Sequence, residues 1–316
     1  MPSQFYRRVI VLMVLFLSLL VLTLTGCEQN QDQVKGIRDR QKFESEPRIT
    51  VKLPGLTKTM PLEQYVTGVV AGEMKKDWPQ NAYGAQAIIA RTFALQYMEA
   101  NNTDTISGEF EYAQEYKPEN ITETIRKAVE ETRGEVALYK DDYIKAWFHA
   151  SAGGQTTTAR VGLAYEKEEP PYIKSVKSPD DEAPADVRNW TTSFSRNEIE
   201  KALESLGKSV GDLKNVEIKN KDKTGRVIEF KVSGSKKGVS VKAPELRVAL
   251  DPKKLKSTKI TELKKEGDKY IFKGSGFGHG VGMSQWGAYS MARDGKSAEE
   301  IVKYYFKDIE IARVYD

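Results

Sequence analysis

Only one stretch of the sequence is long and apolar enough to insert into a membrane by itself, and it lies at the N-terminus. The run from Val9 to Leu22 follows Arg7 and Arg8, and the residues Thr23-Leu24-Thr25-Gly26 separate it from Cys27. A charged start, an apolar middle and a small-residue end are typical of a secretory signal. Since no second stretch reaches this length, the sequence excludes a polytopic membrane protein and predicts an exported globular body.

The end of this signal, Leu24-Thr25-Gly26-Cys27, resembles a bacterial lipobox, in which the cysteine is lipidated and becomes the first mature residue. We therefore expect a lipoprotein signal peptide at 1–26, lipidation of Cys27 and a flexible polar tether at 27–47. The protein would then be lipid-anchored to the cell membrane and face the extracytoplasmic side. The alternative is an uncleaved transmembrane anchor, because the apolar run is near the lower length limit for a spanning helix.

Composition narrows the classes of function further. The 316 residues are 39% hydrophobic and 30% charged, which supports a packed core and excludes wholesale disorder. The net charge is only +4, so nothing indicates a nucleic-acid partner. Cys27 is the only cysteine, and His149 and His279 are the only histidines. An intrachain disulfide and a closed cysteine-rich zinc site are therefore excluded.

Helical and strand-like patterns alternate irregularly along the rest of the chain. The predicted strands are 48–53, 135–139, 143–148, 215–219, 227–233, 239–242 and 270–273, and predicted helices begin at Pro61, Pro79, Asn120, about Arg196, Pro244, Ser284 and Ser297. Residues 165–190 are rich in Pro, Asp and Glu and predict a long surface excursion. Without regular βαβ alternation, the expected fold class is α+β, with mixed helices and antiparallel strands.

Glu73 interrupts an apolar pattern. It continues the helical stripe formed by Leu62, Val66 and Val69, so its carboxyl is expected on the face that is buried or lines a cleft. Burial raises a carboxyl pKa, as a general acid near neutral pH requires. Alternatively, the helix ends by Gly72 and Glu73 is simply solvated.

Arg91 interrupts a face of small residues that includes Gly84, Ala87 and Ala94. A buried arginine needs an anionic partner, and Glu73 is a candidate. The alternative is an arginine whose stem lies along the surface while its charge stays in water.

Glycine alternates with other residues from Gly274 to Gly282. The run does not have the spacing of a P-loop, a dinucleotide-binding loop or a nucleophile elbow. Alternate glycines allow a ligand or another backbone to come close, or form a tightly packed structural turn. His279, within this run, is either an acid/base or substrate-binding group, or a structural residue.

His149 lies two residues before Ser151, which raises the question of a Ser–His pair. No acidic residue that would orient the histidine is identifiable, so a catalytic triad is not supported. His149 and His279 with a carboxylate could in principle bind zinc, but no recognised ligand spacing is present.

Three segments together resemble the stage II sporulation protein D family, which includes amidase-enhancer relatives. They are Pro61–Met74, then Trp78–Arg91 with the run Ala85–Thr92, and then Gly276–Ala288, which reads GFGHGVGMSQWGA. The resemblance covers about residues 48–309 and leaves 310–316 as a C-terminal tail.

The resemblance implies a peptidoglycan lytic transglycosylase, which cleaves the β-1,4 bond between N-acetylmuramic acid and N-acetylglucosamine and leaves a 1,6-anhydro end. The family's acid/base glutamate matches Glu73, and an arginine needed for activity matches Arg91. We expect two lobes that flank a glycan groove walled by the glycine-rich loop. The expected substrate-binding residues are His279, Gln285, Gly278, Gly280, His149 and Ser151.

The implied partners are peptide-stripped glycan strands, a cell-wall amidase and other sporulation membrane proteins, with a role in engulfment. Some relatives hold zinc through cysteine and histidine. Because Cys27 is the only cysteine, no metal and no other cofactor is carried over. The alternative function is a non-catalytic glycan-binding protein that stimulates an amidase.

Overall fold

The structure is a computed structural model that describes residues 43–108 and 114–316. Apart from the turn residues Lys140–Asp142, the described residues belong to one structural unit. Helices and mainly antiparallel sheets are mixed along the chain, which confirms the predicted α+β class. The buried hydrophobic residues of this unit form two separate cores.

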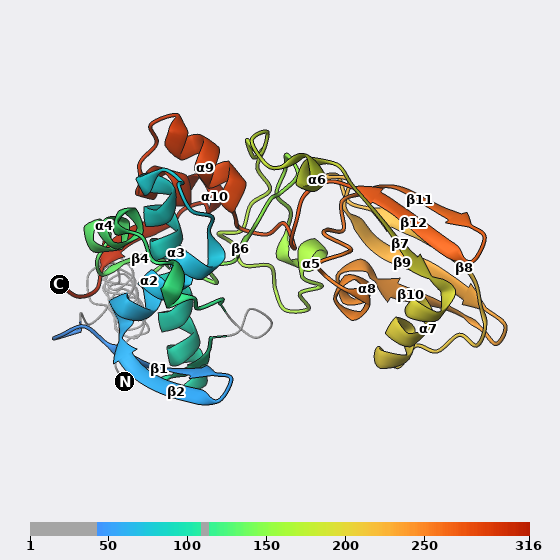
Figure 1. Cartoon of the computed structure of the whole chain (residues 1–316), viewed down its shortest axis with the longest axis horizontal. Coiled ribbons are helices and arrows are strands. Elements are labelled where there is room, and N and C mark those ends of the chain that lie inside the picture. Colours follow the sequence, from blue (N-terminus) through green and yellow to red (C-terminus); the bar gives the residue numbers. More distant parts are fainter. Residues whose placement is uncertain (1–42, 109–113) are drawn as a thin grey trace, which may run out of the picture. The chain divides into compact units, whose positions relative to one another are not determined.

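The first core is built from residues in 49–173 and 281–315. Its helices are α2 (Leu62–Glu73), α3 (Gln80–Asn101), α4 (Glu123–Glu131), α9 (Gln285–Arg293) and α10 (Ala298–Tyr305). Helix α3 packs against the other four (Figure 1). One sheet has the order β2-β1-β3, formed by Leu56–Pro61, Arg48–Leu53 and Thr105–Ser107. Another has the order β14-β4-β5, formed by Glu310–Arg313, Glu135–Tyr139 and Asp142–Tyr143.

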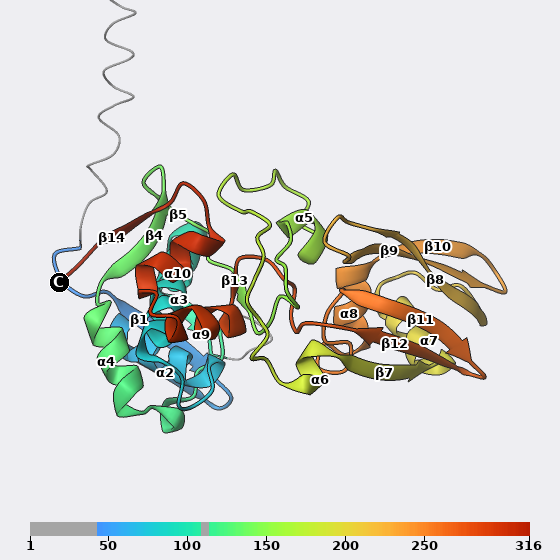
Figure 2. The ribbon, with the colours of Figure 1, turned by 90° about the horizontal axis from the view of Figure 1, so that it is seen from above.

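The second core lies within residues 190–272. One sheet has the order β10-β9-β8, formed by Gly238–Lys242, Val227–Gly234 and Leu213–Lys221. The other has the order β11-β12-β7, formed by Ile260–Glu266, Lys269–Gly274 and Trp190–Ser195. Figure 2 shows α7 (Arg196–Ser205) and α8 (Ala243–Leu250) beside these sheets.

Short elements connect the two sets. They are β6 (Phe148–His149), α5 (Ala159–Gly162), α6 (Ala185–Arg188) and β13 (Met283–Ser284). The 3-10 turn Pro118–Asn120 belongs to the first set, where it contacts α2. Strands β6 and β13 pair in parallel, which joins the segment after β4 to the glycine-rich loop.

Local sequence signals explain several of the helix starts. Pro61 and Pro79 stand immediately before α2 and α3, in an extended backbone conformation that leads into the first helical turn. Ser195 and Ser297 form capping boxes with Glu198 and Glu300, so α7 and α10 begin where their sequences predict. The predicted apolar stripe of α2 is buried.

Three sequence predictions are wrong. The cap of α4 is Thr122 rather than Asn120, because the hydroxyl of Thr122 accepts from Ile125 N while Pro118–Asn120 forms a separate 3-10 turn. Within 165–190, Tyr172, Asp180 and Val187 are buried, so this segment is not a surface excursion.

The third correction concerns residues 310–316, which are not a tail. Strand β14 pairs with β4, and Tyr315, which follows β14, is buried. Strands β2, β3, β7, β11 and β14 were not predicted, and the strand predicted at 143–148 is reduced to β5 and β6.

The predicted signal peptide and Cys27 lie outside the described residues, as does most of the predicted tether. Its last residues are bound to the body, because Phe43 N donates to Val314 O and Glu46 pairs with Arg133. None of the described helices combines the length and apolar character that crossing a bilayer needs.

Candidate functional site

Glu73 is the last residue of α2, and its side chain is partly exposed. One carboxylate oxygen accepts a hydrogen bond from Glu115 N at 2.7 Å. The segment around Glu115 crosses the end of α2 closely: a Cβ at Gly72 would lie 2.2 Å from Glu115 O, and Lys117 N donates to Gly68 O. The absence of a side chain at Gly72 therefore allows this backbone to hold the Glu73 carboxyl.

Burial is the main cause that raises the pKa of Glu73, to about 7. The hydrogen bond from Glu115 N and the charge of Lys117 oppose this effect, and the negative charge of Glu115 adds to it. Glu73 also contributes, after burial, to the raised pKa of the nearby Tyr65. A carboxyl that titrates near neutral pH and is partly open to solvent has the properties of a general acid and base.

Arg91 is fully buried, and its partner is Glu63 rather than Glu73. Its Nε and Nη2 donate to the two oxygens of Glu63 at 2.8 and 2.7 Å, and its Nη1 donates to Glu135 O at 2.8 Å. Tyr315 OH and Gly134 N also donate to Glu63. Burial by itself would raise the pKa of Glu63. The charge and hydrogen bonds of Arg91 and the hydrogen bonds from Tyr315 and Gly134 oppose it, and the pKa lies below its ordinary value.

This geometry corrects the expectation that Glu73 is the anionic partner of Arg91. The Arg91 guanidinium has no exposed surface, and its donors face groups of its own core. Glu63 was not singled out from the sequence. The sequence did contain a sign of its role. Glu63 lies in the first turn of the same buried helix, where a carboxylate also interacts favourably with the helix dipole.

The glycine-rich loop packs against the chain itself. Gly276, Gly278, Gly280 and Gly282 all have positive φ angles. A Cβ at Gly278 would meet the His149 side chain at 2.7 Å, and one at Gly280 would meet the Arg226 guanidinium at 2.2 Å. These two glycines are therefore needed for close internal packing, and their substrate contacts stay predictions.

The two histidines lie beside each other with ring centroids 5.4 Å apart. His149 is buried, its Nδ1 lies 3.1 Å from Val281 O, and burial with the charge of Arg226 lowers its pKa to about 3. His279 is partly exposed, and its Nδ1 accepts a hydrogen bond from Val281 N. Its pKa lies well below the usual value, mainly because its ring is largely removed from water and secondly because His149 is nearby. Both rings are therefore neutral near pH 7, which disfavours a role for either as a general acid there.

Ser151 does not pair with His149. Its hydroxyl donates to the buried Asp180 at 3.0 Å, and Asp180 also accepts from the hydroxyls of Ser178 and Ser284. Asp180 was missed in the sequence because it lies in the segment interpreted as a surface excursion. It ties the 150–154 loop to the start of α9.

Gln285, also predicted to bind substrate, is buried at the start of α9 and donates weakly to Gln86 on α3 at 3.4 Å. Among the described residues, no group of three or more His, Cys, Asp or Glu side chains is placed to hold a metal ion.

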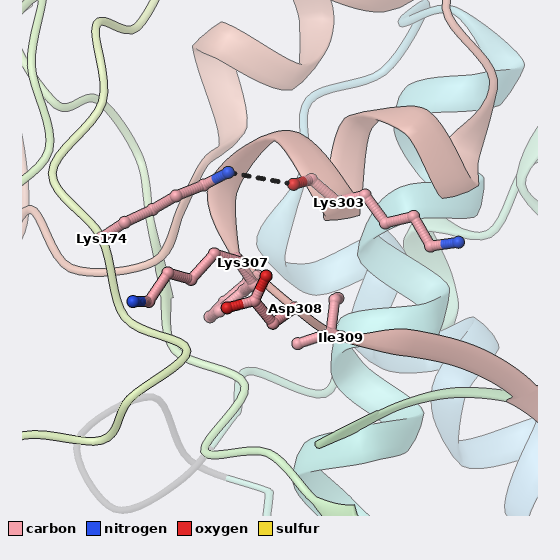
Figure 3. Close-up of a pocket in the computed structure, with 6 residues that line it drawn as sticks. Lys174, Lys303, Lys307, Asp308 and Ile309 are labelled. Carbon is pink, nitrogen blue, oxygen red and sulfur yellow. Dashed lines mark hydrogen bonds between the residues drawn. The ribbon is translucent and has the colours of Figure 1, made fainter. Parts of the chain in front are cut away.

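A pocket of about 310 Å³ lies elsewhere on the unit, between residue 174 and the end of α10. Lys174 Nζ donates to Lys303 O at 3.3 Å, and Lys307 and Asp308 also line the pocket (Figure 3). No predicted site residue lines this pocket, so we place the candidate site at Glu73.

Comparison with known proteins divides the chain near residue 140. Residues 54–139 match a family model described as stage II sporulation protein, and this region contains Glu63, Glu73 and Arg91. Residues 143–282 match a domain of unknown function (DUF8618), which contains both histidines.

Relatives that match 76–80% of the chain extend these matches. An uncharacterized protein of Brachyspira hyodysenteriae is 32% identical over 256 residues, which cover 79% of this chain and 66% of that protein. Stage II sporulation protein D of Bacillus subtilis is 30% identical over 277 residues, with coverage of 80% and 75%. An amidase enhancer of Bacillus subtilis is 27% identical over 287 residues, which cover 76% of this chain and 39% of that protein.

Proposed function

The chain belongs to the stage II sporulation protein D family, and from this premise we propose that it is a peptidoglycan lytic transglycosylase that remodels the cell wall during sporulation. The observation that carries the proposal is the carboxyl of Glu73, held at the end of α2 with a pKa of about 7 and partly open to solvent.

The reaction needs only one protein carboxyl. Glu73 in its acid form donates its proton to the glycosidic oxygen as the bond from that oxygen to C1 of the muramic unit breaks. The 6-hydroxyl of the same unit then forms a bond to C1 and gives its proton to the Glu73 carboxylate. The products are a 1,6-anhydromuramic end and a new free hydroxyl, no water is consumed, and Glu73 is returned to its acid form. Ordinary glycosidases need a second carboxylate because their nucleophile does not belong to the substrate.

In this proposal, Arg91 does not contact the substrate and supports catalysis by holding α2 in place. Its ion pair with Glu63 joins α2 to α3, and its bond to Glu135 O adds β4. These contacts fix the helix that carries Glu73. We therefore assign Arg91 a positioning role, and reserve the acid and base roles for Glu73.

A test uses the full-length chain and purified glycan strands stripped of stem peptides. Mass spectrometry should detect 1,6-anhydro ends with the wild type and about 10²–10⁴-fold fewer with Glu73→Gln. The matched control is Glu130→Gln, the same substitution at an exposed position of α4, which should retain activity. Binding of glycan by the wild type without any anhydro product would overturn the transglycosylase assignment.

The second candidate is a glycan-binding protein that stimulates a cell-wall amidase. The amidase enhancer of Bacillus subtilis supports it, although this chain spans 39% of that protein's length. Adding the chain to a purified amidase separates the two candidates. Faster release of stem peptides, unchanged by Glu73→Gln, favours the enhancer.

A further inference from the structure

Three aromatic side chains form a cluster just beyond the end of α2. The Trp78 and Trp286 ring centroids lie 4.7 Å apart, and Tyr289 lies 5.0 Å from Trp78 and 5.3 Å from Trp286. Trp78 is buried, whereas Trp286 and Tyr289, on the first turns of α9, are partly exposed. The buried ring therefore fixes the orientation of two rings that reach the surface.

Cationic side chains lie over the two exposed rings. Lys75 Nζ is 5.1 Å from the Trp286 centroid, and the Arg293 guanidinium is 5.8 Å from the Tyr289 centroid. Arg293 shares its charge with Glu182, whose carboxylate lies 3.7 Å away. Lys75 also lies close enough to Asp186 to contribute to its lowered pKa, but the main partner of Asp186 is Lys256, at 2.7 Å. Of these cations, Lys75 is the one that lies over the Trp286 ring, so its charge would be next to a ligand bound there.

The cluster adjoins Glu73 along the chain. Lys75 follows Glu73 by two residues, so their Cα atoms are at most about 7 Å apart. The connection is also fixed in space, because Tyr83 OH donates to Lys75 O and accepts from Trp78 N. The short stretch of chain that carries Lys75 and Trp78 therefore begins at the candidate acid and is held in one conformation.

The chemistry of these residues selects a class of ligand. The C–H faces of a pyranose ring are apolar and pack against aromatic rings, while the hydroxyls at the edge of the sugar remain solvated. An ammonium beside the stacked ring pairs with a carboxylate on the sugar. Muramic acid carries such a carboxylate on its lactyl group when no stem peptide is attached. When a stem peptide is attached, the lactyl group forms an amide bond and has no charge.

We propose that Trp286 and Tyr289 form a saccharide subsite next to Glu73, and that Lys75 selects there a sugar with a free carboxylate. The inference rests on the proposed function for its substrate, but it assigns residues that the family resemblance left without a role. Trp78 supports the two rings from below and does not contact the ligand.

Binding is measured in the Glu73→Gln background, so that glycan is not consumed. The ligands are peptide-free glycan strands and the same strands with their lactyl carboxylates converted to amides. Lys75→Met should weaken binding of the carboxylate form about tenfold or more, and leave binding of the amidated form unchanged. Its neighbour Lys76, also exposed, provides the control: Lys76→Met should bind both forms as the parent does.

The aromatic platform has its own test. Tyr289→Ala should weaken binding of both glycan forms, and Tyr289→Phe, which keeps the ring, should restore it. A melting curve for each variant identifies loss of folding, and Trp286 is left intact because its ring packs on the buried Trp78. Equal weakening of both forms by Lys75→Met, or no effect of Tyr289→Ala in a folded protein, would overturn the subsite.

Failure of the subsite and failure of the proposed function give different results. If wild-type protein releases anhydro ends while Lys75→Met and Tyr289→Ala cleave with unchanged KM, the subsite is wrong and the transglycosylase stands. If the variants lose binding as expected but the wild type never cleaves, the subsite stands and the catalytic function is wrong.

Discussion

The guanidinium of Arg91 and the carboxylate of Glu63 form a buried two-point ion pair, with Nε–Oε1 and Nη2–Oε2 distances of 2.8 and 2.7 Å. The pair links α2 to α3 at one end of α2, while Glu73 occupies the other end. The helix thus carries one carboxyl whose pKa is lowered and another whose pKa is raised. The first stabilises the structure, and the second is available for chemistry.

Glu63→Gln should destabilise the protein by about 3–5 kcal/mol, because a buried guanidinium would lose its only charged partner in the described core. Urea unfolding of the variant and wild type gives the difference in free energy. Glu130→Gln, exposed on α4, is the control and should change little. An unchanged free energy of unfolding for Glu63→Gln would contradict a structural role for the pair.

The raised pKa of Glu73 predicts how activity and stability depend on pH. Activity should fall above about pH 7, where the acid form is lost. The folded state holds this proton to higher pH than the unfolded state, whose carboxyl titrates near 4.5. The contribution of Glu73 to stability is therefore complete below pH 4.5 and is lost as the pH rises through 7.

Glu73→Gln removes this titration, and should also reduce glycan cleavage by about 10²–10⁴-fold. Relative to the variant, the wild type should lose free energy of unfolding between pH 4.5 and 8, as measured by urea unfolding at several pH values. A difference that stays constant over this range would mean that the carboxyl has an ordinary pKa.

Gly280→Ala should destabilise the glycine-rich loop for two reasons. The backbone φ is 79°, and the new methyl would meet the buried Arg226 guanidinium at 2.2 Å. The backbone conformation alone costs a non-glycine residue about 1–3 kcal/mol. Gly225→Ala is the matched control, with φ 83° and no atom within 4 Å of the new methyl. Unfolding experiments should show the larger loss for Gly280→Ala, and equal losses would mean that Arg226 moves aside without cost.

Tyr315→Phe tests whether the C-terminal strand supports the ion pair. The Tyr315 hydroxyl donates to Glu63 Oε1 at 2.6 Å inside the core. Hydrogen bonds to charged groups contribute about 1.5–3 kcal/mol, so the variant should lose stability by this amount in urea unfolding. Tyr304 donates to Lys177 O at the surface, and Tyr304→Phe should change stability much less. Comparable effects from both variants would argue against a special role for Tyr315.

The proposed lipid anchor is tested at Cys27. Cells that express the wild type should incorporate a labelled fatty acid into the protein, and Cys27→Ala should abolish the label. The chain has no other cysteine, so the substitution removes the only candidate site for thioether attachment. A wild-type protein that never takes up label would favour the uncleaved transmembrane anchor.

Elements whose start or spacing is written in adjacent residues could be predicted from the sequence. Pro61 and Pro79 precede α2 and α3, Ser195 and Ser297 cap α7 and α10, and β1 has its predicted bounds. Proline geometry and capping hydrogen bonds act over a few residues, and a periodic apolar stripe identifies a buried face without the partner being known. The stripe also identified Glu73 as a carboxyl on a buried face.

The partners of charged groups depended on the tertiary structure. Arg91 selects Glu63, 28 residues earlier, and Tyr315 completes the same cluster from 252 residues away. The buried Asp180 likewise accepts hydrogen bonds from hydroxyls that lie far apart in the sequence, such as those of Ser151 and Ser284. The sequence determined where the longer helices form, and it placed Glu73 on the apolar stripe of α2. Only the tertiary structure decided which carboxyl is neutralised by a cation and which remains free to hold a proton. Coulomb and desolvation energies depend on distances that helical spacing does not fix, such as those from Glu63 to Arg91, Gly134 and Tyr315.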